Sequence, residues 1–218
     1  MKALPYVLFS LITLVPGAGA GTILLNSMPG LANSLTPETV GITPHSAWQL
    51  NNPENPMDPS DTSAIWISYA ATGYTDPAWQ PYSGTDPVVS IYHSFTSNAG
   101  YLRLYVWADD TAEVLLNGVS LFSPAFTQST CSGQPIGCRT QDYGVIEASF
   151  GSGSHQLEFR LFQTGTGGDS TSNPFGLLYT GGAYSEAATH TPEPASLALS
   201  AGAVLAIAYA GLRRRRSQ

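Results

Sequence analysis

Three glutamates are the side chains of this sequence best suited to acid–base chemistry: Glu113, Glu147 and Glu158. Glycoside hydrolysis needs two carboxyl groups that flank the scissile bond, one acting as an acid and the other as a base or nucleophile. Each glutamate falls on the polar side of a predicted strand, which is the ordinary place for a solvated acid. We therefore expect no enzyme, and a hydrolase of envelope polysaccharide is the enzymatic alternative.

The histidines and serines show no catalytic spacing. None of the four histidines belongs to a His-Glu-x-x-His zinc pattern, and residues 118–122 lack the second glycine of a Gly-x-Ser-x-Gly elbow. His93 and His155 fall inside predicted strands, where we expect them to fill a sheet face.

Aromatic side chains offer flat apolar faces with a polar edge, and sugar rings stack on such surfaces. Trp79 and Tyr82 lie in a proline-rich loop, 76–82, and are the pair that we expect to be exposed and to bind a ligand. Six other aromatic residues are candidates for a stacking surface, but sandwich cores use the same residue types: Trp48, Trp66, Tyr92, Tyr101, Tyr105 and Trp107. We expect most of these to pack in the core.

Cys131 and Cys138 are the two cysteines of the chain and are separated by six residues. A zinc site would need third and fourth ligands that this pair does not provide. In an exported protein, an even number of cysteines at short spacing predicts a disulfide. We expect Cys131 and Cys138 to be bonded to each other.

The elements that must position these residues are short strands. Residues 101–107 alternate apolar and polar side chains with the period of two that is typical of a strand. Asn117-Gly118 stands between two apolar runs and predicts a hairpin turn. The runs that predict strands are 64–69, 88–95, 101–107, 113–116, 119–122, 144–150, 155–162 and 175–179.

The predicted fold class is all-β, a single antiparallel β-sandwich or jelly roll. We place its core at 64–185 and a turn-rich N-terminal part of the same ectodomain at 21–63. The 218-residue chain has eight basic and fifteen acidic side chains, a net charge of −7. The segment 21–194 contains three arginines and all fifteen acidic residues, so its formal net charge is −12. Such a surface repels anionic polymers and excludes nucleic acid as a partner.

Both ends of the chain have the composition of targeting segments. Lys2, the apolar run 6–15 and the small residues 18–20 predict a signal peptide, 1–20, that signal peptidase removes; an uncleaved anchor or a buried helix is the alternative. Residues 195–212 carry no charge and predict a transmembrane helix. The basic tail, 213–218, holds a cluster that the positive-inside rule keeps in the cytoplasm, Arg213, Arg214, Arg215 and Arg216. A buried core helix followed by a basic arm is the alternative here.

The linker 186–194 contains Pro192, Glu193 and Pro194. This tripeptide, the apolar helix and the terminal arginines together resemble the PEP-CTERM sorting signal of bacterial surface proteins. The resemblance implies that exosortase, a membrane-embedded transpeptidase, recognises the tripeptide and removes the helix. It also implies an intermediate anchored in the inner membrane, and then transfer to the cell surface or the exopolysaccharide matrix. A permanent tail anchor is the alternative.

Residues 101–110 and 114–121 resemble the central hairpin of galactose-binding-like and PA14-like jelly rolls. In PA14-like lectins, paired aspartates at the end of such a strand hold a calcium ion that coordinates a sugar. The resemblance therefore implies calcium at Asp109 and Asp110, although the other ligand loops of that family are not recognisable in this sequence. The alternative is an acidic turn between two strands.

These patterns support three hypotheses of function. The first is a structural or adhesive protein of the cell surface or biofilm matrix, sorted by exosortase. The second is a carbohydrate-binding module for exopolysaccharide or envelope glycan, with calcium as a candidate cofactor. The third is a hydrolase of envelope polysaccharide.

Overall fold

The computed structural model describes residues 21–74, 85–124, 126, 136–164 and 174–185. The predicted signal peptide, Pro192–Glu193–Pro194, the apolar segment 195–212 and the arginine cluster lie outside these ranges, and so do Trp79, Tyr82 and Cys131. Within the described ranges, no helix is long and apolar enough to cross a bilayer.

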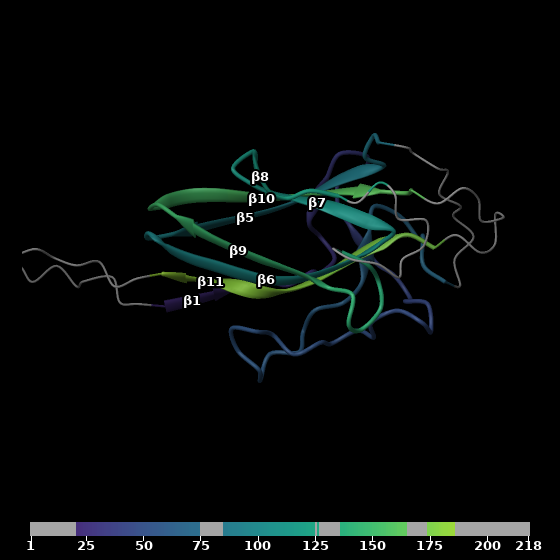
Figure 1. The fold of residues 1–218 in the computed structure, drawn as a ribbon, viewed down its shortest axis with the longest axis horizontal. Coiled ribbons are helices and arrows are strands. Elements are labelled where there is room, and N and C mark those ends of the chain that lie inside the picture. Colours follow the sequence, from purple (N-terminus) through teal and green to yellow (C-terminus); the bar gives the residue numbers. More distant parts are fainter. Residues whose placement is uncertain (1–20, 75–84, 125, 127–135, 165–173, 186–218) are drawn as a thin grey trace, which may run out of the picture. The chain divides into compact units, whose positions relative to one another are not determined.

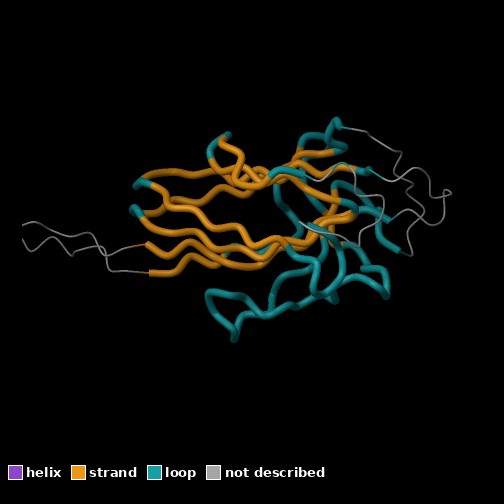
Figure 2. Tube along the Cα trace, viewed as in Figure 1, coloured by secondary structure: helices purple, strands orange, loops and turns teal. Residues whose placement is uncertain are grey.

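The described residues form an all-β structure in which two antiparallel sheets face each other as a sandwich (Figures 1 and 2). Within the described ranges, six strands make up the first sheet: β1 (Gly21–Leu24), β3 (Val40–Gly41), β4 (Ile67–Ser68), β6 (Gly100–Asp109), β9 (Gly144–Phe150) and β11 (Gly176–Ser185). Five strands there make up the second sheet: β2 (Ala32–Asn33), β5 (Val89–Ser97), β7 (Thr111–Leu116), β8 (Val119–Phe122) and β10 (Gly153–Phe162). The predicted fold class is confirmed at this level.

The strand order places the longest strands at the centre of each sheet. The first sheet runs β3-β4-β11-β6-β9, with β1 also paired to β11, and the second runs β2-β5-β10-β7-β8. In Figure 1 the layer that contains β5, β10, β7 and β8 lies above the layer that contains β6, β9, β11 and β1. Strands β6 and β10 therefore contribute their inward faces to one shared core.

The core forms because the strands alternate. On β6, Leu102, Leu104 and Val106 are fully buried, and on β10 Leu157 and Phe159 are fully buried. Burying one such side chain contributes about 1.5–3 kcal/mol. The residues between them point to the outer faces, so the sequence pattern decides which side chains each outer face displays.

A second apolar cluster covers part of the outer face of the first sheet. It is built around Trp107 of β6 and Leu178 of β11, onto which Trp48 of the turn-rich N-terminal segment and Trp66, next to β4, pack. The rings of Trp48 and Trp66 are 4.3 Å apart, and both are buried. This second cluster lies at the Asp109 end of β6. Tyr101, at the other end of β6, is not part of it.

The two ends of the sandwich differ. At one end, Gly21 pairs with Ser185, Ser185 with Gly100, and Gly100 with Phe150. The described chain therefore begins and ends side by side, next to the β5–β6 and β9–β10 hairpins. The opposite end carries the turn at Asp109 and the longer connections between strands (Figure 2).

Candidate functional site

The outer face of the first sheet displays a row of tyrosines and charges beyond the second apolar cluster. We call it the tyrosine strip and define it by five residues from β6, β9 and β11: Tyr101, Arg103, Tyr105, Glu147 and Tyr184. They share one face because Tyr101, Arg103 and Tyr105 alternate with the buried leucines of β6. The strip therefore follows from the period of the strand.

Two tyrosines of the strip are directly opposite each other on neighbouring strands. Tyr101 on β6 pairs with Tyr184 on β11, and the two side chains are 37% and 42% exposed. Cβ atoms of directly opposed antiparallel residues are about 4.5–5.5 Å apart. Two exposed tyrosines therefore occupy opposed positions on neighbouring strands of this face.

Charged groups lie beside this pair. Arg103 and Glu147 are cross-strand partners, with Nε and Oε1 3.4 Å apart. Partial burial raises the pKa of Tyr101, and the hydrogen bond of its hydroxyl with Glu147 raises it further. The Arg103 guanidinium is 5.7 Å from the ring centre of Tyr105, which itself packs on Tyr143 at 4.7 Å. Hydrogen-bonding groups of both kinds therefore lie between the exposed Tyr101 and the half-buried Tyr105.

This combination can bind a sugar. The faces of tyrosine rings accept the apolar C–H face of a pyranose, and their hydroxyls form hydrogen bonds at the edge. A guanidinium donates and a carboxylate accepts strong hydrogen bonds, which matches adjacent sugar hydroxyls. The strip extends over three neighbouring strands, so its extent suits a run of sugar units better than an isolated ring.

Asp109 and Asp110 are adjacent, buried and joined by a cis peptide bond at the end of β6. Burial raises the pKa of Asp109, the neighbouring carboxylate of Asp110 raises it further, and a hydrogen bond from Trp48 lowers it in part. The Asp110 Oδ2 atom accepts a hydrogen bond from the backbone amide of Thr164 at 2.9 Å. The pair is therefore held by the fold at the end that carries the long connections.

Calcium takes six to eight oxygen ligands. Among the described residues, no group of three histidine, cysteine, aspartate or glutamate side chains is placed to hold a metal ion. Calcium at Asp109 and Asp110 stays a prediction.

The candidate catalytic glutamates are divided between the two sheets. Glu147 lies on the first sheet in the tyrosine strip, whereas Glu113 and Glu158 lie on the outer face of the second sheet. There, Arg160 bonds both: its Nε donates to Glu158 Oε1 at 2.7 Å and its Nη1 to Glu113 Oε2 at 3.2 Å. The structure thus brings two of the three together around a cation.

The strand histidines have structural partners. His93 Nδ1 is 2.6 Å from the hydroxyl of Tyr179, and His155 contacts the Asn117 side chain and the carbonyl of Gly151 at 3.0 Å each. The expectation that the large aromatic residues mostly pack is confirmed for Trp48, Trp66 and Trp107, which are buried. Cys138 is also buried in the second cluster, and its predicted bridge to Cys131 stays a prediction.

Sequence reasoning named Tyr101 and Tyr105 but missed Tyr184. The last strand is predicted to end at 179, whereas β11 continues to Ser185. The signal that could have found it is the alternation of Thr180, Gly182 and Tyr184 on one face. The partner of Arg103 was missed as well, because cross-strand register is not visible in a sequence.

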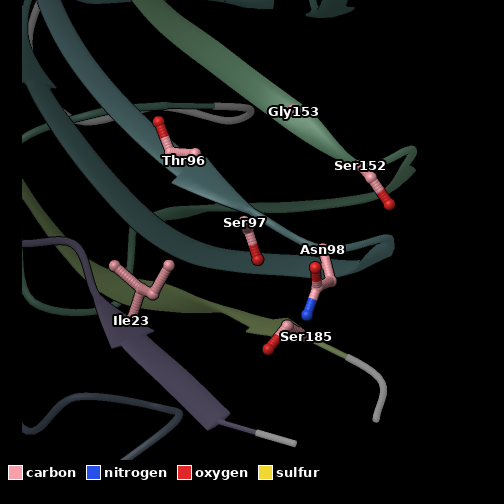
Figure 3. Close-up of a pocket in the computed structure, with 7 residues that line it drawn as sticks. All are labelled: Ile23, Thr96, Ser97, Asn98, Ser152, Gly153 and Ser185. Carbon is pink, nitrogen blue, oxygen red and sulfur yellow. The ribbon is translucent and has the colours of Figure 1, made fainter. Parts of the chain in front are cut away.

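A pocket of about 440 Å3 opens at the end where the described chain begins and ends (Figure 3). Its lining combines one apolar residue with small and polar ones: Ile23, Thr96, Ser97, Asn98, Ser152, Gly153 and Ser185. These side chains include neither an aromatic ring nor a charge, so we assign no ligand to this pocket.

No family model matches the sequence, and no curated protein matches it. Among solved structures, a family 35 carbohydrate-binding module from Clostridium thermocellum is similar, with 11% identity, a TM-score of 0.32, and coverage of 73% of this chain and 90% of that one.

Two enzymes also show similarity in part of their length. A Podospora anserina GH26-CBM35 β-(1,4)-mannanase has 11% identity and a TM-score of 0.34 over 79% of this chain and 29% of its own. A cycloisomaltooligosaccharide glucanotransferase of Paenibacillus sp., solved with cycloisomaltoheptaose, has 11% identity and a TM-score of 0.32 over 76% and 18%. At these values the similarity carries no argument about ligand or site, so a ligand class has to be inferred from this chain's own residues.

Proposed function

We propose that this chain is an exported surface protein whose β-sandwich binds neutral carbohydrate through the tyrosine strip. The observation that carries the proposal is the presence of two exposed tyrosines, Tyr101 and Tyr184, at opposed positions on neighbouring strands beside the Arg103–Glu147 ion pair. Rings and hydrogen-bonding groups in this arrangement match the two kinds of surface that a sugar presents.

The charge of the chain supports a neutral ligand. The segment from 21 to 194 carries −12, so an anionic polymer would be repelled by the surface as a whole. Within the strip, Arg103 is already paired with Glu147 and presents no unbalanced positive charge. A neutral polysaccharide is the ligand class that meets no electrostatic penalty.

Sorting to the surface is the second part of the proposal. The apolar segment 195–212, the arginines after it and Pro192–Glu193–Pro194 support recognition by exosortase, and residues 1–20 support export through a signal peptide. We also assign the sandwich to the jelly rolls of the galactose-binding-like or PA14-like class. The β6–β7–β8 segment supports this assignment, with Asp109–Asp110 at one turn and Asn117–Gly118 at the next.

Affinity gel electrophoresis tests the binding proposal. The full-length chain is run in gels that contain a neutral polysaccharide, either a mannan or a β-glucan, or the anionic polymer alginate. We expect retardation in a neutral gel and none in alginate. Replacing Tyr101 and Tyr184 together by alanine should weaken binding at least about tenfold, about 1.4 kcal/mol, because both stacking faces are lost.

The matched control is Tyr74→Ala, which removes a tyrosine that is 50% exposed and lies outside the strip. Retardation of this variant should equal that of the parent. Equal retardation of the double variant and the parent, or retardation by alginate alone, would show that the strip is not the binding surface.

The intact mass of the protein isolated from the surface of an exosortase-containing bacterium tests the sorting proposal. We expect a mass that lacks residues 1–20 and the apolar segment. Replacement of Glu193 by alanine should leave the chain at its membrane-anchored length. A surface protein that still contains residues 195–218 would contradict processing and leave a permanent tail anchor.

A further inference from the structure

A second pocket lies on the outer face of the second sheet, away from the tyrosine strip. It has a volume of about 370 Å3, and we call it the arginine pocket. Residues from β7, β10 and the segments beside β5 and β8 line it, and six of them carry the argument: Pro87, Glu113, Pro124, Phe126, Arg160 and Phe162. The volume is near the lower end of the range of small-molecule sites, about 300–1,000 Å3.

The polar wall of the pocket is a fixed planar cation. Arg160 and Glu113 are cross-strand partners, and Glu158 on the same strand as Arg160 also bonds its guanidinium. The hydroxyl of Ser90 donates to Glu158 Oε1 at 3.0 Å, which fixes that carboxylate in turn. The side chain of Arg160 remains 38% exposed, so the guanidinium can still reach a ligand.

The charge of this group decides which ligands it accepts. One arginine faces two glutamates, so the wall has a formal charge of −1. A carboxylate or phosphate would meet a cation that is already neutralised, together with an excess negative charge. A pair of hydroxyls meets no such penalty, because it can accept from the guanidinium and donate to a carboxylate.

The apolar wall consists of rings. Phe126 is 42% exposed and meets the buried ring of Phe162 edge to face, with their centres 5.1 Å apart. The buried ring fixes the exposed one, and Pro87 and Pro124 extend the apolar surface. A flat exposed ring opposite a hydrogen-bonding wall matches a pyranose, which has an apolar face and a polar edge.

We propose that the arginine pocket binds one neutral sugar ring, at a chain end or a branch, with Phe126 against its face and Arg160 and Glu113 on its hydroxyls. The inference rests on the proposed function for its ligand class. The inference differs from the proposed function in two respects. It uses another surface of the sandwich, and that surface binds an isolated sugar ring instead of a run of sugar units. The two surfaces belong to different sheets, so either binding proposal can be wrong while the other is right.

Saturation-transfer NMR and calorimetry on the full-length chain test the inference. Any detergent that keeps the full-length chain in solution must lack sugar groups, since an alkyl glycoside would compete for the pocket. The probes are the methyl glycosides of glucose, galactose, mannose and N-acetylglucosamine, with methyl glucuronide as the anionic probe. We expect at least one neutral glycoside to bind and the glucuronide to bind at least tenfold more weakly.

Variants assign the binding to the pocket. Phe126→Ala removes an exposed ring and should weaken binding of the neutral glycoside at least tenfold, and Glu113→Gln, of the same size, should weaken it as well. Val119→Ala is the matched control, because Val119 is exposed on β8 and is not among the pocket residues. It should bind as the parent does.

The combined variant of Tyr101 and Tyr184 separates this inference from the proposed function. It should keep glycoside binding even though it loses polysaccharide binding. The inference is overturned if no neutral glycoside binds the parent, if the glucuronide binds best, or if Phe126→Ala and Glu113→Gln both bind as tightly as the parent. Loss of glycoside binding in the tyrosine variant would place the ring in the strip instead.

Discussion

The pair His93 and Tyr179 links the interior of the sandwich to pH. Tyr179 is fully buried, stacks on Phe159 at 4.3 Å and holds His93 through its hydroxyl. Burial lowers the pKa of His93 below its ordinary value of 6.5. When the pH falls below about 6.5, the unfolded chain therefore takes up the proton before the folded one. The stability that His93 contributes is complete above that pH and is lost as the pH falls through the folded pKa.

This predicts that the melting temperature of the parent falls relative to that of His93→Gln as the pH is lowered from 7 to 5. Scanning calorimetry measures the melting temperatures of the parent and the variant at matched pH values. The difference between the two melting temperatures isolates His93 from the other titrating groups. His45→Gln is the control, because that residue lies outside the His93–Tyr179 pair, and it should keep the parental slope. An unchanged slope in His93→Gln would show that His93 does not titrate in this range.

At the scale of single elements, the close approach of two strands explains why residue 100 is a glycine. Gly100 begins β6 where β11 ends, and a Cβ atom there would collide with the backbone carbonyl of Tyr184. The neighbouring backbone cannot yield without breaking the ladder between β6 and β11. Gly100→Ala is expected to lower the free energy of unfolding by about 1–3 kcal/mol, as measured by urea titration. Gly151→Ala, at the same end but with open space around its Cβ position, should differ from the parent by less than about 0.5 kcal/mol.

Strands and turns that depend on local sequence are predicted correctly, whereas elements that depend on tertiary packing are not. Alternation predicts β6 and β10, and Asn117 and Gly118 both have the positive φ of the predicted turn, at 53° and 79°. The 64–69 run predicts a full strand, but only Ile67–Ser68 pair as β4, and Trp66 packs in the second apolar cluster. Tertiary packing overrides local propensity there.

The candidate site was less predictable than the fold. Tyr101 and Arg103 are visible as outward residues of one strand, but Tyr184 and Glu147 join them through register between segments that are far apart in the sequence. The same holds for Arg160, whose partner Glu113 comes from another strand. A sequence indicates which residues face outward, and only the pairing of strands shows which of them meet.

At the scale of the whole domain, the two proposed surfaces lie on opposite layers. The tyrosine strip belongs to the outer face of the first sheet and the arginine pocket to that of the second. Gly21 and Ser185, where the described chain begins and ends, pair with each other at one end of the sandwich and belong to neither surface. The two proposals together predict that one molecule holds two different glycan chains and that binding at both sites cross-links a polysaccharide.

Cross-linking gives a prediction that binding at one surface does not. Mixed with a branched neutral polysaccharide that binds it, the full-length chain should raise turbidity, with a maximum at intermediate protein-to-glycan ratios. Phe126→Ala should still be retarded in the affinity gel and yet produce no turbidity, because each molecule then holds only one chain. Short oligosaccharides should dissolve the parental aggregates by occupying both sites. Equal turbidity from Phe126→Ala and the parent would mean that the aggregates form by self-association or through the strip alone, and the two-surface arrangement would be wrong.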